Sequence, residues 1–180
     1  MAKNTSNYYL VENLDNLLYH MIRKVKPEDA SGIISIYNHY VLHTDITFET
    51  EEVTISEMSQ RILDISGHYP YLVYEESGAI LGYCYASLWK KRKAYQHSVE
   101  STVYVSPSAH SRGIGQVLMN ALLEELKQLP IHTIIACIAL PNPPSIKLHE
   151  KLGFRQVSCF REVGFKFNKW IDVGDWELLL

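Results

Sequence analysis

Hydrophobic and polar positions change their period in the middle of the chain, around residues 106–113. The residues before this point alternate as in a half-buried strand, where neighbouring side chains point to opposite faces. One face carries Val99, Val103 and Val105, and the other carries Glu100, Thr102 and Tyr104. After Pro107, which has no N–H to give to a strand ladder, apolar residues recur at helical spacing. They are Ile114, Val117, Leu118, Ala121, Leu122 and Leu126. The pattern predicts a strand, a glycine-containing turn and an amphipathic helix.

The segments before this centre predict strands and helices in turn. Residues 21–26 have the pattern of a first strand, and Pro27 suits the first turn of a helix. The apolar stripe of that helix is Ile33, Ile36, Tyr37, Tyr40 and Val41. A loop at residues 43–50 leads to a second helix that starts at Thr54 or Ser56. Residues 71–74 and 79–89 are expected to form two strands joined by a turn at residues 75–78. In residues 1–20, Leu10, Leu14, Leu17 and Leu18 have the spacing of a short additional helix.

The segments after the centre predict a buried strand, a short helix and a last pair of strands. Residues 131–140 form a nearly unbroken apolar run, which is typical of a central strand covered on both faces. Asn142 is suited to cap a helix at residues 145–152, and Gly153 is suited to end it. Residues 154–180 are rich in Phe and Trp and are expected to turn around Gly164 and at residues 168–169.

Composition and charge narrow the class of protein. A chain of 180 residues with 47% hydrophobic and 21% charged residues suits one globular domain with a full core. A formal net charge of −3 argues against a nucleic-acid-binding protein. The sequence shows no apolar run long enough to span a membrane and no evident signal peptide, so we expect a cytoplasmic protein. Cys84, Cys137 and Cys159 lie in strand-like stretches and are predicted to be buried thiols. Their spacing does not suit a metal site, and we expect no metal.

The turn between the central strand and helix has the composition of a phosphate-binding loop. Gly113 and Gly115 lack a Cβ and precede a helix, whose first N–H groups have no partner within the helix. Arg112 and His110 add nearby donors. No Lys-Ser/Thr follows the last glycine, and the three glycines of the dinucleotide fingerprint are not present. The remaining pattern is Q/R-x-x-G-x-G/A, with His110 in the first position. A plain turn before a core helix remains the alternative.

Five ordered segments give this loop a family context. They are 37–40 (YNHY), 89–95 (WKKRKAY), 100–105 (ESTVYV), 140–145 (LPNPPS) and 172–174 (DVG). Together they resemble the phosphinothricin/methionine sulfoximine acetyltransferase branch of the GCN5-related N-acetyltransferase (GNAT) superfamily. The resemblance runs from about Met21 to the C-terminus. It therefore implies an N-terminal extension at residues 1–20 and one GNAT domain at residues 21–180.

The resemblance implies a fold and a coenzyme site. The fold is α/β (α+β), with a mixed, mostly antiparallel central sheet that is flanked by helices and has splayed central strands. Acetyl-CoA is the implied co-substrate. The backbone of Val103, Tyr104 and Val105 would pair with its pantetheine arm. The turn would hold its diphosphate through His110, Ser111, Arg112, Gly113, Ile114, Gly115 and Gln116. Asn142 and Ser145 would complete the coenzyme site. A homodimer is also expected, with C-terminal strands or helices as the contact.

The acceptor side is less well defined by the residues. Glu100 is predicted to be the general base, because its strand places it beside Thr102 and Tyr104. The alternative is a glutamate that faces solvent at the edge of the sheet. By resemblance, Phe48, Lys90, Arg92 and Tyr95 would contact the substrate, although residues 90–93 also fit an ordinary solvated loop. His149, at a position where tyrosine is usual, would protonate the leaving thiolate or only pack near the coenzyme. Asn38 and His39 fit either helix capping or a role on the substrate side.

These predictions indicate an N-acetyltransferase that acts on the α-amine of a small amino acid of the phosphinothricin or methionine sulfoximine type, by direct attack on acetyl-CoA. Resistance to such compounds is the corresponding biological role. Asp175 stands where the resemblance predicts an aromatic residue, and Ile171 where it predicts histidine, so substrate preference is left open. A peptide or protein N-terminal acetyltransferase and a non-catalytic acyl-CoA-binding module remain alternatives.

Overall fold

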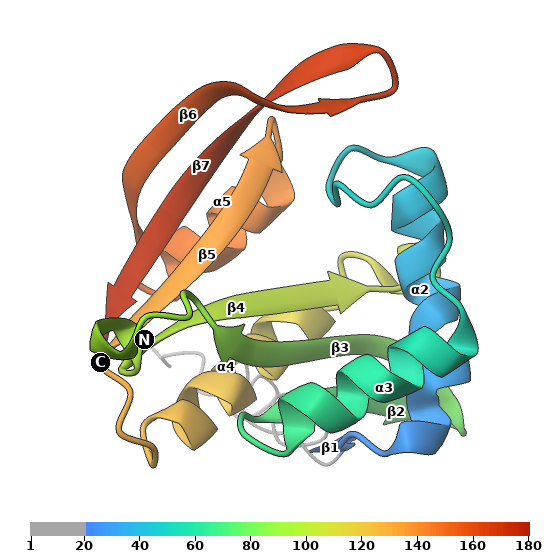
Figure 1. Ribbon diagram of the computed structural model, residues 1–180. Coiled ribbons are helices and arrows are strands. Elements are labelled where there is room, and N and C mark those ends of the chain that lie inside the picture. Colours follow the sequence, from blue (N-terminus) through green and yellow to red (C-terminus); the bar gives the residue numbers. More distant parts are fainter. Residues whose placement is uncertain (1–20) are drawn as a thin grey trace, which may run out of the picture.

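A seven-stranded sheet with helices on both faces organises residues 21–180, which are the residues that the computed structural model describes (Figure 1). The strands are β1 (Ile22–Lys24), β2 (Tyr71–Glu76), β3 (Ala79–Leu88), β4 (Ser98–Val105), β5 (Thr133–Leu140), β6 (Arg155–Lys166) and β7 (Lys169–Leu179). The helices are α2 (Ala30–His43), α3 (Ile55–Ser66), α4 (Ile114–Leu126) and α5 (Pro143–Lys151). The predicted helix within residues 1–20 lies outside the described residues.

The sheet consists of two halves that meet at β4 and β5. The strand order is β1-β2-β3-β4-β5-β7-β6, and every neighbouring pair is antiparallel except β4 and β5. These two strands pair in parallel only where Ser98–Glu100 meets Thr133–Ile135. Beyond that junction they diverge, as the open V between them shows (Figure 1). The predicted mixed sheet with splayed central strands is therefore confirmed.

Two apolar clusters hold the helices to the sheet. One cluster packs α4 against the face that carries Val99, Ile134 and Trp176. The other packs α2 and α3 against the face that carries Val73 and Tyr83. Burial of these side chains supplies most of the free energy that favours folding. The alternation predicted for β4 is confirmed, because Val99, Val103 and Val105 belong to the α4 side and Tyr104 to the other side.

Capping and turn residues in the sequence set the ends of several helices and strands. Thr54 caps α3 by accepting a hydrogen bond from the Glu57 N–H, and Asn142 caps α5 in the same way from the Ser145 N–H. The hairpin between β2 and β3 turns at Ser77 and Gly78, whose φ angles are 52° and 79°. Gly153, with φ 93°, follows α5 as predicted.

Three expectations about packing are wrong. Cys137 and Cys159 are exposed, and only Cys84 is buried. Cys159 lies on β6, an edge strand with most of its residues exposed. Cys137 is open because the divergence of β4 and β5 uncovers one face of β5, so that strand is not covered on both faces along its length. Asn38 neither caps a helix nor faces a substrate site, since its side chain bonds to both backbone groups of Val53.

Within residues 21–180, none of the helices has the length and apolar character needed to cross a membrane. The same residues contain no group of three or more His, Cys, Asp or Glu side chains that could hold a metal ion.

Candidate active site

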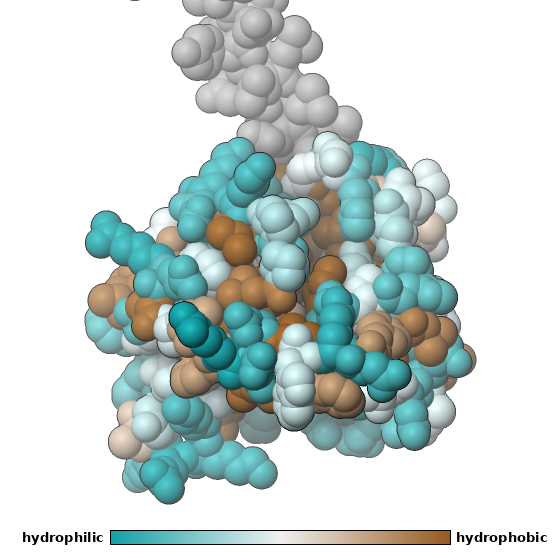
Figure 2. All heavy atoms as spheres, turned by 90° about the horizontal axis from the view of Figure 1, so that it is seen from above, coloured by the Kyte–Doolittle hydropathy of each residue, from teal (hydrophilic) through white to brown (hydrophobic). Residues whose placement is uncertain are grey.

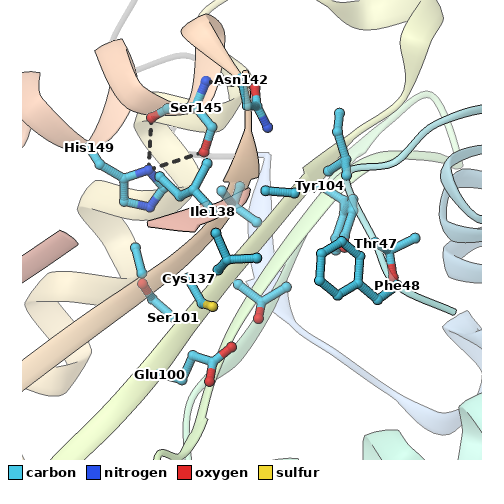
Figure 3. A pocket seen from close by; sticks show the side chains of 16 residues that line it. Thr47, Phe48, Glu100, Ser101, Tyr104, Cys137, Ile138, Asn142, Ser145 and His149 are labelled. Atoms are coloured by element: carbon cyan, nitrogen blue, oxygen red, sulfur yellow. Dashed lines mark hydrogen bonds between the residues drawn. The ribbon is translucent and has the colours of Figure 1, made fainter. Parts of the chain in front are cut away.

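A cavity of about 240 Å³ occupies the gap where β4 and β5 diverge (Figure 3). Its walls come from both strands, from β7, from α5 and from the loop between α2 and α3. They include Thr47, Phe48, Glu100, Ser101, Thr102, Cys137, Ile138, Asn142, Ser145, His149 and Val173. The sequence predicted five of these residues, namely Phe48, Glu100, Asn142, Ser145 and His149. The cavity is therefore built from chain segments more than 100 residues apart.

A groove of about 440 Å³ continues from this cavity along the end of β4 to the start of α4. Both hollows are lined by Val103, Tyr104, Asn142 and Ser145, so they share one wall. The groove also contains most of the predicted coenzyme residues: Val105, His110, Ser111, Gly113, Ile114, Gly115 and Gln116. The structure thus brings the predicted phosphate turn and Glu100 to opposite ends of one continuous space.

The turn at the head of the groove requires glycine for a conformational reason. Gly113 precedes α4 with φ 80°, in the left-handed region that other residues avoid. A Cβ on this residue would meet no neighbour within 4 Å, so its backbone angle rather than crowding explains the glycine. Gly113 directly precedes the first turn of α4, which lines the groove and whose leading N–H groups have no partner within the helix. This geometry suits a bound anion.

Two predicted coenzyme contacts have other partners. The Tyr40 hydroxyl donates to the Val105 carbonyl at 2.6 Å, and His110 Nε2 lies 2.8 Å from the same hydroxyl. The Val105 carbonyl is therefore already bonded. Arg112 donates from a single nitrogen, Nη2, to both carboxylate oxygens of Glu76 at 2.8 Å, and it does not line the groove. His110 stays in the groove wall, whereas Arg112 points away from it.

Glu100 is placed where a carboxylate is difficult to ionise. It lies at the inner end of the gap, opposite Ile135 in the short parallel ladder. Burial raises the pKa of the Glu100 carboxyl, and the Asp175 carboxylate raises this pKa further. A carboxylate with a raised pKa is a stronger base than one in open water. The alternative of a glutamate that faces solvent is excluded by this location.

His149 is held in one tautomer inside the cavity wall. Its side chain is 3% exposed, and its Nδ1 lies 2.9 Å from the Ser145 carbonyl oxygen, which can only accept (Figure 3). The neutral ring therefore carries its hydrogen on Nδ1, which leaves a lone pair on Nε2. Among the described residues, no group bonds to this buried Nε2. Burial lowers the pKa of His149, so the neutral ring is favoured.

Comparison with known proteins places this arrangement in a family. The profile of the acetyltransferase (GNAT) domain matches residues 22–174. The chain belongs to the GNAT acetyltransferase family.

Individual GNAT relatives match over nearly the whole chain. A phosphinothricin N-acetyltransferase of Streptomyces coelicolor is 41% identical over 160 residues, 87% of this chain and 94% of the relative. An L-methionine sulfoximine/L-methionine sulfone acetyltransferase of Salmonella typhimurium is 34% identical over 164 residues, covering 88% and 94% of the two chains. A phosphinothricin acetyltransferase of Sinorhizobium meliloti, solved in complex with AcCoA, matches with a TM-score of 0.85 and 36% identity, covering 88% and 87%.

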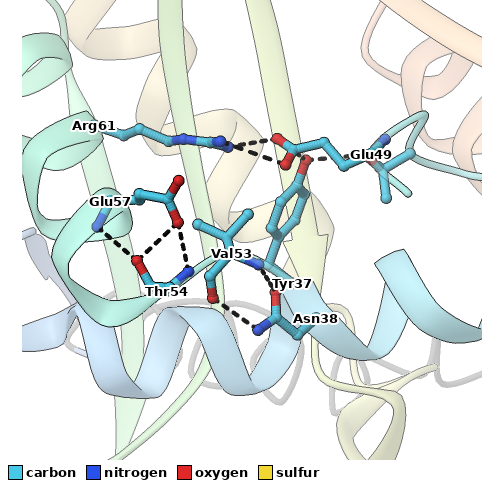
Figure 4. Close-up of polar contacts among 8 residues, drawn as sticks. Tyr37, Asn38, Glu49, Val53, Thr54, Glu57 and Arg61 are labelled. Carbon is cyan, nitrogen blue, oxygen red and sulfur yellow. Dashed lines mark hydrogen bonds and ion pairs between the residues drawn. The ribbon is translucent and has the colours of Figure 1, made fainter. Parts of the chain in front are cut away.

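In this GNAT domain, the loop between α2 and α3 is fastened to both helices (Figure 4). Tyr37 on α2 bonds to Thr47 and Glu49, and Arg61 on α3 bonds to Glu49 at 2.5 Å. Asn38 holds the far end of the loop through Val53. These bonds fix the part of the loop that carries Phe48 over the cavity.

The tip of the β6–β7 hairpin fastens the same loop from the other side. Lys166 is 3% exposed and donates from Nζ to the Thr47 carbonyl at 2.8 Å. Lys169 forms an ion pair with Asp45. A Cβ on Gly164 would lie 2.3 Å from the Phe48 ring, so only glycine permits this approach. Sequence reasoning missed Lys166, because alternation with Phe165 and Phe167 predicts an exposed lysine, whereas here both phenylalanines are exposed and Lys166 is on the covered face.

The other predicted substrate residues do not line the cavity. Lys90, Arg92 and Tyr95 belong to the connection between β3 and β4, which includes the short turn Lys93–Tyr95. Lys90 Nζ sits 3.9 Å from the centre of the Trp89 ring, and none of these residues lines the cavity. This connection leads into β4, which starts two residues before Glu100, at the end of the gap where β4 and β5 still pair.

Sequence reasoning also missed Thr47, Ser101, Cys137 and Val173. Cys137 could have been found from the alternation of β5, since Ile134, Ala136 and Ile138 belong to the α4 side and leave it on the other face. Ser101 is the small residue among the valines of β4, and it faces the α5 side of the gap.

Proposed function

We propose that this protein transfers the acetyl group of acetyl-CoA to the α-amine of a small amino acid of the phosphinothricin or methionine sulfoximine type. The observation that carries the proposal is the position of Glu100, partly buried at the inner end of a gap that is continuous with the groove at the Gly113 turn. The relatives named above act on these compounds by name, and their similarity supports the same acceptor class.

The residues present suit acetyl-CoA. The first turn of α4 would bind its diphosphate, with His110 and Ser111 beside it. The edge of β4 beyond Glu100 has no strand ladder on the β5 side, so the backbone of Val103 and Tyr104 is available to the pantetheine amides. Asn142 uses its Oδ1 to cap α5, and its Nδ2 remains as a donor. The bound thioester would then lie beside the cavity.

Glu100 would take the proton that makes the amine nucleophilic. An α-ammonium group has a pKa of roughly 8 and must lose a proton before its nitrogen can attack. The neutral nitrogen then forms a C–N bond with the acetyl carbon while the C–S bond breaks. The nitrogen releases a second proton, and the departing thiolate takes up one proton to give the free thiol of coenzyme A. The net reaction releases one proton from the ammonium substrate.

His149 would contribute as an acceptor in its neutral form. With its hydrogen held by the Ser145 carbonyl, Nε2 offers a lone pair and no proton. The ring would therefore orient a donor in the cavity, such as a hydroxyl or an N–H. The thiolate would draw its proton from solvent or from the proton released by the amine, which is sufficient because a thiol pKa of about 8.5 makes thiolate a competent leaving group near neutral pH.

The test is steady-state acetylation of an amino-acid panel, followed by thiol release from acetyl-CoA. Wild-type protein is expected to acetylate amino acids on the α-nitrogen, and Glu100→Gln is expected to lower kcat by roughly 10²–10⁴-fold. Affinity for CoA, measured by calorimetry, should stay unchanged. Activity confined to peptides would replace the proposed acceptor with a polypeptide N-terminus. CoA binding with no acetylation of either class would indicate an acyl-CoA-binding module.

We also propose that the protein is a cytoplasmic homodimer whose contact lies on the β6–β7 hairpin. Large apolar side chains are more than half exposed there: Val157, Phe160, Val163, Phe165 and Trp170. Side chains of this kind are rarely left in water on a long edge strand. Hydrophobic groups also gather among hydrophilic ones on the face seen from above (Figure 2). The three free thiols suit a reducing compartment.

Sedimentation velocity tests the dimer. Phe160→Asp is expected to give a monomer, because it places a charge within the apolar hairpin surface. Ile55→Asp is the matched control, since Ile55 is 55% exposed on α3 and Phe160 is 53% exposed on β6. A wild-type monomer at micromolar concentration would contradict the dimer and leave the acetyl-transfer proposal intact.

A further inference from the structure

We propose that Lys151 binds the 3′-phosphate of coenzyme A and thereby lets the protein distinguish CoA from dephospho-CoA. This role rests on the proposed function, because it concerns the groove that would hold acetyl-CoA. It adds to that function a side chain that recognises one particular group of the acetyl donor.

The helix α5 presents one stripe of residues to the groove. Pro144 and Leu148 line the groove, and Lys151 follows Leu148 by three positions. Residues that are three or four positions apart lie on the same face of a helix. Leu148 also lies close to the start of α4, because a Cβ on Gly115 would be 3.4 Å from its Cδ2. The face of α5 that carries Lys151 is therefore the face turned toward the first turn of α4.

A hydrogen bond holds the Lys151 side chain at the rim of the groove. Its Nζ donates to Gln116 Oε1 at 2.7 Å, and Gln116 lies in the first turn of α4 and lines the groove. Lys151 itself is exposed. An ammonium group has three N–H donors, so two donors of Lys151 have no hydrogen-bond partner within residues 21–180. They remain for a ligand.

Two basic side chains of the preceding turn are already engaged. Arg112 is paired with the Glu76 carboxylate, and His110 Nε2 lies 2.8 Å from the Tyr40 hydroxyl. Lys151 is bonded to a neutral amide instead, and the ion pairs among the described residues do not include it. The positive charge of Lys151 is therefore left to attract an incoming anion.

The chemistry of CoA indicates which anion this is. The N–H groups at the start of α4 suit the diphosphate, which needs no further side chain there. The 3′-phosphate is a separate branch on the ribose. As a phosphate monoester with a second pKa of roughly 6, it carries nearly two negative charges at neutral pH. Such a group is best matched by a full positive charge with free donors, and Lys151 provides both beside the helix end.

CoA and dephospho-CoA test this assignment, because they differ only in the 3′-phosphate. Both would be titrated into the full chain and followed by calorimetry. Wild-type protein is expected to bind CoA more tightly than dephospho-CoA. Lys151→Met should lower the affinity for CoA roughly three- to fivefold, as for an exposed ion pair, and leave the affinity for dephospho-CoA unchanged. Lys151→Arg should keep the preference for CoA, and added salt should reduce it.

Lys147→Met is the matched control. Lys147 is also exposed on α5, but it lies one position before Leu148 and therefore off the stripe that faces α4. Its removal takes away the same charge from the same helix and should leave the ratio of the two affinities unchanged. An equal fall of the ratio in both variants would mean that overall charge sets the preference, and the assignment of Lys151 would be wrong.

The remaining outcomes separate this role from the proposed function. If Lys151→Met weakens CoA and dephospho-CoA equally, the side chain does not recognise the 3′-phosphate, and the acetyl-transfer proposal stands. If wild-type protein binds both forms equally well, the proposed discrimination is absent and acetyl transfer is again unaffected. If wild-type protein binds neither form, the proposed function itself fails.

Discussion

At the scale of single residues, the cavity contains two ionisable groups whose pKa values are shifted in opposite directions. Burial raises the pKa of Glu100 and lowers the pKa of His149, because in each case the neutral form is favoured away from water. Glu100 is therefore a better base than a free carboxylate, and the neutral form of His149 is favoured. Environments that separate pKa values in this way are typical of catalytic sites.

The pH profile of kcat/KM should report the Glu100 carboxyl. Activity requires its ionised form, so the rate should rise with pH through a pKa above the ordinary value of 4.5. Asp175→Asn removes a negative charge that opposes this ionisation. Its profile should therefore move its acidic limb to lower pH, measured with one neutral acceptor in both proteins. A limb that stays in place would show that Asp175 does not act on Glu100.

The stability of the protein should depend on pH through His149. Its folded-state pKa lies below the ordinary 6.5, so between these two values the unfolded chain binds a proton that the folded chain does not. The free energy of unfolding should consequently fall as pH is lowered from about 6.5 through the folded-state pKa. His149→Phe, which fills the same site beside Phe154, should make thermal unfolding less sensitive to pH in this window than in wild type. Parallel curves for both proteins would contradict the shift.

Some of these residues could be predicted from the sequence and others could not. Glu100 and Gly113 follow from local pattern, because strand alternation and a glycine before a helix act over a few residues. Arg112 also fits the local pattern, yet Glu76 from a distant hairpin binds its guanidinium. Cys137 fits a buried strand, yet the divergence of β4 from β5 opens its surroundings. In both cases the deciding partner is remote in sequence.

At the scale of elements, helix ends carry part of the predicted coenzyme site. The Asn142 side chain has two roles: Oδ1 caps α5, and Nδ2 would donate to the coenzyme. Different substitutions can separate these roles. Asn142→Ala should lower the free energy of unfolding by about 1 kcal/mol through loss of the cap. Asn142→Asp should keep the cap and the stability but weaken acetyl-CoA binding, because the donor becomes an acceptor. Chemical denaturation and calorimetry measure the two effects; weakened stability in the Asp variant would contradict this division.

The elements themselves were largely predictable, because helical spacing and capping residues are local signals. The strand pattern in the sequence did not predict the gap between β4 and β5. Residues 131–140 form the apolar run of a strand that is covered on both faces. Periodicity describes which faces of a strand are buried, but it does not show where the strand separates from a neighbouring strand. The gap was expected only from the resemblance to a family.

At the scale of the whole molecule, the α2–α3 loop and the tip of the β6–β7 hairpin join the two halves of the sheet across the cavity. Lys166 is the buried part of this connection, through its bond to Thr47. Lys166→Met should raise KM for the amino acid several-fold, because the segment that carries Phe48 is released on one side. Affinity for acetyl-CoA should change much less, because Ile46 is the one residue of this loop that lines the groove.

Lys169→Met is the control for this prediction, and a smaller effect on KM is expected from it. Its ion pair with Asp45 is exposed, and such pairs contribute roughly 0–1 kcal/mol, so the rise in KM should be smaller. An equal loss of affinity for acetyl-CoA in Lys166→Met would show that the variant disturbs the whole fold rather than the acceptor side.

The three-residue ladder between β4 and β5 has a consequence for how new specificities can arise. Beyond this ladder, a small molecule rather than a strand would complete the hydrogen bonding of β4, and it would be recognised mainly through main-chain atoms. Main-chain recognition is insensitive to most substitutions. Side chains on the other face of the same strands can therefore change without loss of acetyl-CoA binding. A single exchange in the wall of the acceptor cavity would therefore alter acceptor preference while the binding of acetyl-CoA stays unchanged.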